Sequence, residues 1–185
     1  MDKKFTHDRQ KEYQNSNWYR YAIGYKNAAL LITDNLLNSN SEISNELIFP
    51  IFFLYRHFTE LLLKQIIAEY ATLSGKRIEI PKTHNLLTLW NKVKTLNKEV
   101  LFVNLDAKES PFKIALSENS FKILDSYIIE LNEYDKYATA FRFPIDRSGE
   151  LSLKSGFSVH LSSIKDGINT VFETLNLITF ALMFV

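Results

Sequence analysis

The stretch "FLYRHFTELLLKQ", residues 53–65, decides the fold. It belongs to a largely apolar segment, residues 47–70, whose side chains recur at helical spacing. An ordinary surface helix carries its polar residues on one wide, continuous face, but here apolar residues occupy the remaining faces. The pattern therefore predicts a helix that is buried around most of its circumference.

Four polar residues nevertheless lie in the middle of this helix. Arg56, Glu60 and Lys64 are four positions apart and form one stripe, which we call the polar row, with His57 at its edge. Two cations and one carboxylate leave one positive charge without a counter-ion, and a buried charge requires one. The counter-ion is either a protein carboxylate such as Asp146, which makes the row structural, or a ligand anion, which makes it functional. We expect the ligand anion.

Composition limits the fold class and the chemistry. The chain has 185 residues, of which 46% are hydrophobic and 14% aromatic, and its net charge is +1. This suits a single domain, residues 1–185, with a polar start, residues 1–14, that we expect to be loose. The absence of cysteine excludes disulfides, thiolate zinc sites and cysteine nucleophiles.

Five segments have the apolar spacing of helices, and together they predict an all-α protein. We expect an up-and-down-type helical bundle of about five main helices, with one short extended or hairpin-like excursion near 140–153. Residues 98–116 fit a loop or a short helix. The helical segments are 17–37, 47–72, 84–97, 117–138 and 158–184.

Four residues predict where these helices begin and end. Pro50 is either a first-turn residue or a kink, and Gly75 is a natural C-terminal stop. Thr83 and Ser117 are candidate N-caps, because their hydroxyl groups accept hydrogen bonds from the first N–H groups of a helix.

Two further polar groups are candidates for a site with the polar row. His84 lies at a predicted helix N-terminus, which suits an anion, although a capping or surface role is an alternative. Arg142 in "FRFPIDRSG" lies between two aromatic residues and is the second candidate site residue. The alternative is a structural arginine that stacks on aromatic rings at a turn that Asp146 initiates. His7 and His160 are isolated, and no metal-binding spacing, phosphate loop or dinucleotide fingerprint is present. We therefore expect no metal and no cofactor.

Three motifs, "YRHFTELLLKQII", "THNLLTLW" and "FRFPIDRSG", together resemble the HEPN superfamily of small prokaryotic helical domains. The resemblance covers roughly residues 45–150. It implies a helical bundle, frequent homodimers, and often a metal-independent RNase in toxin–antitoxin, abortive-infection or CRISPR contexts. The positions that carry it are Arg56, His57, Glu60, Leu61, Leu63 and Lys64, then His84, Leu86, Leu89 and Trp90, and finally Arg142, Phe143, Pro144, Asp146 and Gly149.

The sequence departs from the superfamily's usual Arg-x(4–6)-His motif. Arg56 is followed at once by His57, and the formal match from Arg77 to His84 crosses a loop that contains Pro81. The residue types still suit metal-independent RNA chemistry, which needs a histidine and cations beside a phosphate. We expect candidate catalytic residues His57, His84 and Arg56, and candidate substrate-binding residues Glu60, Lys64, Arg142 and Asp146.

Two functions from different classes remain open at this point. One is an RNA- or nucleotide-binding protein, including a metal-independent endoribonuclease in prokaryotic defence or stress response. The other is a non-catalytic helical dimerisation or partner-binding protein whose polar row is a structural ion network. A partner protein encoded by a neighbouring gene is a further expectation. The apolar end "VFETLNLITFALMFV" predicts a homodimer. Without an apolar signal-peptide core or a run long enough to span a bilayer, the chain is expected in the cytoplasm and not in a membrane.

Overall fold

The structure, a computed structural model, describes residues 7–38, 45–75, 78–103, 118–153 and 160–183. These residues form five α-helices and one short 3-10 helix, and none belongs to an extended strand, which confirms the all-α prediction. The helices are α1 (His7–Asn38), η1 (Asn45–Leu47), α2 (Ile48–Ser74), α3 (Leu86–Val103), α5 (Glu118–Tyr134) and α6 (Leu161–Met183).

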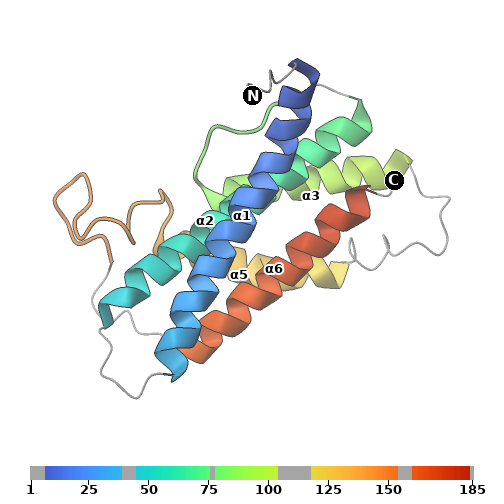
Figure 1. Ribbon diagram of the computed structural model, residues 1–185. Helices are drawn as coiled ribbons and strands as arrows, with labels where there is room; N and C mark the ends of the chain where they lie inside the picture. The colour runs from blue at the N-terminus through green and yellow to red at the C-terminus, as the bar shows by residue number, and fades with distance from the viewer. Residues whose placement is uncertain (1–6, 39–44, 76–77, 104–117, 154–159, 184–185) are drawn as a thin grey trace, which may run out of the picture.

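The central helix of the bundle is α2. It packs against α1, α3 and α6, and α1 and α6 run side by side along the bundle (Figure 1). Sixteen of its 27 residues are buried, on several faces, as the apolar surroundings of the polar row predicted. A helix enclosed in this way needs few polar residues of its own, so the buried polar row requires a specific explanation.

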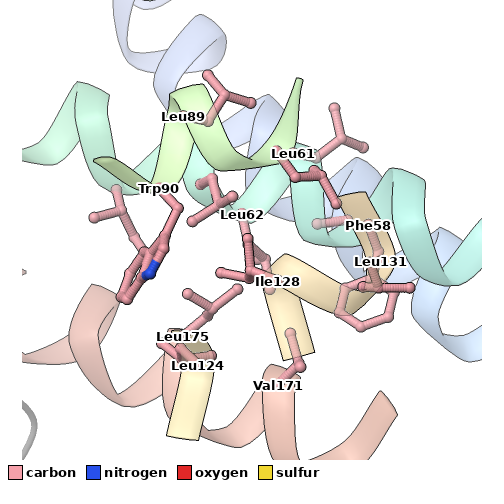
Figure 2. Packing of buried hydrophobic residues seen from close by; sticks show 14 of the residues in the cluster. Phe58, Leu61, Leu62, Leu89, Trp90, Leu124, Ile128, Leu131, Val171 and Leu175 are labelled. Atoms are coloured by element: carbon pink, nitrogen blue, oxygen red, sulfur yellow. The ribbon is translucent and has the colours of Figure 1, made fainter. Parts of the chain in front are cut away.

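The hydrophobic core lies where α2, α3, α5 and α6 meet. Leu62 of α2 lies beside Ile128 of α5, and Phe58 of α2 lies beside Leu131 of α5 (Figure 2). Burial of each such side chain contributes roughly 1.5–3 kcal/mol. Trp90 of α3 donates its indole N–H to Asp125 Oδ1 of α5 at 2.6 Å, which satisfies its polar atom.

The observed helix ends agree with most of the expected ones. Pro50 lies in the first turn of α2, where a missing N–H costs nothing, and Gly75 ends α2 in the left-handed conformation with φ 61°. The expected cap at Thr83 is wrong: Asn85 Oδ1 accepts the N–H of Thr88 at 2.8 Å and caps α3. The hydroxyl oxygen of Thr83 instead accepts the N–H of Asn85 and forms a turn just before the helix.

Other boundaries differ from expectation or lie outside the described residues. Helix α1 begins at His7, ten residues before the expected start, because "HDRQKEYQNSN" contains several good helix formers and neither glycine nor proline. Helix α3 continues to Val103 and so takes up the first part of segment 98–116. The candidate cap Ser117 lies outside the described residues.

The expected excursion is present, and it is a turn closed by one bridge rather than a hairpin of two strands. Ile145 and Leu151 form an isolated antiparallel bridge, and Asp146 N donates to Glu150 O at 2.8 Å. At its base Phe141 stacks on Phe52 of α2, with ring centroids 4.9 Å apart. The excursion, orange in Figure 1, thus projects from the bundle beside α2.

Candidate functional site

The polar row is buried and internally bonded. Arg56 and Glu60 are each 1% exposed, and Lys64 is 8% exposed. Arg56 Nη1 lies 3.2 Å from Glu60 Oε2, and Lys64 Nζ lies 2.8 Å from Glu60 Oε1. The Lys64 ammonium also lies over the Trp18 ring of α1, 5.5 Å from its centroid. All three side chains therefore have partners within the protein.

A second carboxylate balances the row. Asp135, which is 2% exposed and follows the last residue of α5, places Oδ2 3.5 Å from Arg56 Nε. Two cations and two carboxylates then cancel. Asp135 therefore supplies the counter-ion that the sequence analysis had expected from a ligand anion, with Asp146 as the alternative. Breaking such a buried pair leaves an uncompensated charge, which makes the network costly to disrupt.

Arg56 ties three segments of the chain together. Its Nε donates to the backbone carbonyl of Asp135 at 2.9 Å, and its Nη2 donates to the backbone carbonyl of His84. These bonds connect α2 to the end of α5 and to the residue just before the α3 cap. A guanidinium offers five donors in a planar fork, so one side chain serves all three directions.

The network shifts the pKa values of its members. Burial alone would raise the pKa of Glu60, but the hydrogen bond and charge of Lys64, with His84 and Arg56, hold that pKa below its usual value. Burial lowers the pKa of Arg56, against the opposing charges of Asp135 and Glu60. Glu60 is therefore a carboxylate at neutral pH and accepts hydrogen bonds only.

His84 is the point where the buried network reaches solvent. Its side chain is 65% exposed, and its Nδ1 lies 3.0 Å from Glu60 Oε1. Because the Glu60 carboxylate only accepts, His84 Nδ1 carries the hydrogen and Nε2 of the neutral ring becomes the acceptor. A buried carboxylate that fixes one imidazole nitrogen orients the other for proton transfer.

His57, the other candidate base, lies in a different environment. Its ring stacks on Phe53, with centroids 5.6 Å apart, and meets Tyr25 of α1 edge-on at 4.5 Å. Burial, followed by the charges of Arg56 and Lys64, lowers its pKa and favours the neutral ring. His57 therefore packs between α1 and α2, whereas His84 faces solvent.

Arg142 and Asp146 lie in the excursion, outside the polar row. Arg142 Nε donates to Ala138 O at 2.6 Å, and the guanidinium lies over the Phe53 and Phe143 rings at 5.7 and 5.5 Å. Asp146 Oδ1 accepts the N–H of Ser148 at 2.8 Å, and these bonds lower the pKa of Asp146. Both side chains therefore make the contacts of a structural turn, which was the alternative interpretation of this motif.

A groove of about 890 Å³ lies between the start of α3 and the excursion, and His84 is in its wall. Four cationic side chains and one carboxylate line it, an excess of three positive charges. Two large aromatic side chains also line it, Tyr137 and Phe143, which are 69% and 54% exposed. We call this the basic groove; its charged residues are Lys82, Lys136, Arg142, Arg147 and Asp146.

The structure thus separates the predicted site residues into two groups. His84, Arg142 and Asp146 line the basic groove, whereas Arg56, Glu60 and Lys64 form the buried network behind His84. His57 belongs to neither. The contacts give the network a structural role, whereas the groove is open to solvent.

Asp135 was not predicted from the sequence as part of the network, although its position after a helix predicts a nearby cation. A carboxylate just after a helix C-terminus faces the negative end of the helix dipole, which is unfavourable without compensation. Asp135 lies in that place, so a compensating cation was to be expected. The groove cations Lys82 and Lys136 carry no such signal, because isolated surface lysines are common.

None of the described residues forms a group of three or more histidine, aspartate or glutamate side chains that could hold a metal ion. Among the described helices, none is long and apolar enough to cross a membrane. No family model matches the sequence, and no curated protein or solved structure matches it either. The resemblance to the HEPN superfamily therefore stays a prediction.

Proposed function

We propose that the protein binds RNA or a nucleotide in the basic groove. The observation that carries this proposal is the excess of three positive charges beside two exposed aromatic rings. Cations contact phosphates, and exposed aromatic rings stack on unpaired bases, a combination that suits single-stranded nucleic acid. The resemblance to a superfamily with many RNA-directed members points to the same ligand class.

His84 gives this groove a route to chemistry. In a metal-independent cleavage, His84 Nε2 takes the proton of the 2′-hydroxyl, O2′ attacks phosphorus, and the 5′-oxygen leaves with a proton from solvent. Arg142 and Arg147 would stabilise the charge that develops on the phosphate. Glu60 acts as a positioning residue, since its carboxylate holds His84 Nδ1 at 3.0 Å.

Binding is tested with a fluorescent single-stranded RNA dodecamer and anisotropy. Arg147→Glu and Lys136→Glu should each weaken binding about tenfold, because each reverses a charge that faces the phosphates. Lys98→Glu is the matched control: it makes the same charge change on an exposed residue about three turns along α3 from the groove. Equal weakening by Lys98→Glu and the groove variants would contradict the proposal.

Cleavage is tested separately in the presence of a chelator. His84→Ala should abolish cleavage of the same RNA and change its affinity by less than about threefold, since the four cations remain. A wild-type protein that binds RNA without cleaving it would restrict the function to binding. An equally active His84→Ala variant would remove His84 from the mechanism.

A second candidate function is supported by the surface of α6. Leu177 and Phe180 on this helix are 45% and 48% exposed, although Val171, Leu175 and Ile178 are buried. Apolar side chains that the bundle leaves uncovered suit a homodimer or another helical partner. Light scattering at micromolar concentration tests the dimer: Leu177→Glu should give a monomer, and a monomeric wild type would contradict it.

A further inference from the structure

A second cleft is lined by residues of α2, α5 and α6. Its volume is about 300 Å³, and it has none of the cations of the basic groove. Three tyrosines and two carboxylates dominate its lining: Tyr55, Tyr127, Tyr134, Glu130 and Asp166. Its charge is therefore opposite to that of the basic groove, so a different class of ligand is required.

Tyr55 has a buried polar atom that the described residues leave without a hydrogen bond. The side chain is 4% exposed, and its hydroxyl has no hydrogen-bond partner among the described residues. Buried hydroxyls are normally hydrogen-bonded, and leaving one without a partner is unfavourable. Burial raises the pKa of Tyr55, with the nearby Tyr127 and Glu130 as further causes, so it remains a neutral phenol.

Gly167 forms the wall next to this hydroxyl. A Cβ at this position would lie 3.1 Å from the Tyr55 hydroxyl oxygen and 3.2 Å from Tyr127 Cε1. Glycine in a helix interior is unfavourable by comparison with alanine, so α6 accepts a destabilising residue where the tyrosines approach. The missing side chain keeps α6 close to the two rings, and the Tyr55 hydroxyl therefore lies at the wall of the cleft.

The two carboxylates are available to a ligand. Glu130 and Asp166 form no ion pair with any lysine, arginine or histidine in the part of the chain that the structure describes. Together with the Tyr55 hydroxyl oxygen they offer hydrogen-bond acceptors, and the tyrosine rings offer faces that attract cations. This combination matches a primary ammonium group, which carries three N–H donors and one positive charge.

We propose that this cleft binds a primary ammonium group, donated either by a small aliphatic amine or by a lysine side chain of a partner protein. The Tyr55 hydroxyl accepts one N–H, Glu130 and Asp166 balance the charge, and the rings of Tyr127 and Tyr134 enclose the alkyl chain. A quaternary ammonium lacks N–H donors and should bind weakly, which separates this site from a simple aromatic cage. The proposal does not depend on RNA binding.

Isothermal titration calorimetry with n-butylammonium, 1,4-diaminobutane, a lysine-containing pentapeptide and tetramethylammonium tests the proposal and distinguishes the sources. The primary amines or the peptide should bind at least about tenfold tighter than tetramethylammonium, because only they form charge-assisted hydrogen bonds. Tighter binding of the free amines indicates a small aliphatic amine as the ligand, and tighter binding of the peptide indicates a lysine side chain. No binding of any primary ammonium probe, or equal binding of tetramethylammonium, would overturn the proposal.

Three variants locate the site. Tyr55→Phe should weaken n-butylammonium binding about tenfold without lowering the melting temperature, since it removes a hydroxyl that has no partner among the residues that the structure describes. Glu130→Gln should weaken it similarly, and Glu173→Gln, an exposed position further along α6, is the matched control. Unchanged binding by Tyr55→Phe and Glu130→Gln would place the ammonium elsewhere and overturn the proposal. RNA affinity should be unaffected in all three variants, so the two sites fail or succeed independently.

Discussion

The polar row and the basic groove meet where His84 contacts Glu60, and they handle charge in opposite ways. In the row, Arg56 and Lys64 are buried and face two carboxylates, Glu60 and Asp135, so the charges cancel. In the groove the cations are on the surface and outnumber the single carboxylate by three. Burial forces a protein to neutralise its own charges, whereas solvent allows an excess to persist. The excess, not the buried charge, indicates where an anionic ligand would bind.

The largest effect that tests this comparison is expected from Glu60→Ala. Removing the carboxylate that both Arg56 and Lys64 contact leaves two buried cations with one counter-ion. The free energy of unfolding should fall by about 3–5 kcal/mol. Urea unfolding followed by circular dichroism measures it, with Lys136→Ala in the groove as a control that should change stability by less than about 0.5 kcal/mol. A loss below about 1 kcal/mol for Glu60→Ala would show that the row is not a structural network.

Asp135→Asn should have the next largest effect. The asparagine side chain can still accept the N–H groups of Thr139 and Ala140, which Asp135 Oδ1 accepts at 2.7 and 3.0 Å. Its amide, however, would turn a donor toward the Arg56 guanidinium and remove a charge. We expect a loss of about 1–3 kcal/mol in the same unfolding measurement. An unchanged stability would mean that Arg56 depends only on the backbone carbonyls.

The polar row and its partner Asp135 show which part of the network could be predicted from the sequence. The row itself and its burial followed from the i,i+4 spacing of Arg56, Glu60 and Lys64 among apolar residues. The partner Asp135 did not, because it is 79 positions from Arg56 and reaches it only through the packing of α5 near α2. Spacing reports contacts within one helix, whereas contacts between helices depend on crossing geometry that periodicity does not encode.

The groove and the caps illustrate the same limit. His84 and Arg142 were identified from local motifs, and the structure brings both to one groove. Lys82 and Lys136 were not identified, since nothing local distinguishes them from other surface lysines. Thr83 was expected to cap α3 and Asn85 does so instead, because both residue types accept N–H bonds and only backbone geometry selects between them.

Acid provides a third test, which is directed at the row. The folded pKa of Glu60 is held below its ordinary value of 4.5, so its contribution to stability is present above pH 4.5 and is lost as pH falls through the folded pKa. Each unit of that difference contributes about 1.4 kcal/mol. Glu60→Gln should remove this loss in urea unfolding series between pH 5 and the acid limit of folding, relative to the wild type.

His57 allows an internal control in the same series. Its folded pKa is also lowered, from 6.5, so the unfolded chain takes up its proton first and stability begins to fall below pH 6.5. This earlier loss should persist in Glu60→Gln, because burial is its main cause. An identical pH dependence for wild type and Glu60→Gln below pH 4.5 would show that Glu60 is not held as a buried carboxylate.

The smallest expected effect on stability belongs to the groove, and there the largest change should be in salt dependence. Arg147→Ala removes an exposed cation with no ion-pair partner among the described residues, so the free energy of unfolding should change by less than about 0.5 kcal/mol. If Arg147 contacts a phosphate, its loss releases about one counter-ion fewer on binding single-stranded RNA. The slope of log affinity against log salt should then decrease by about 0.7.

Lys64→Ala should have the opposite pattern. It should lower the free energy of unfolding and leave the salt slope unchanged, because the Lys64 charge is matched by Glu60 inside the protein. Titrations at several potassium chloride concentrations measure both slopes, and a Lys64→Ala variant that changes the slope as much as Arg147→Ala would place the phosphate at the row after all.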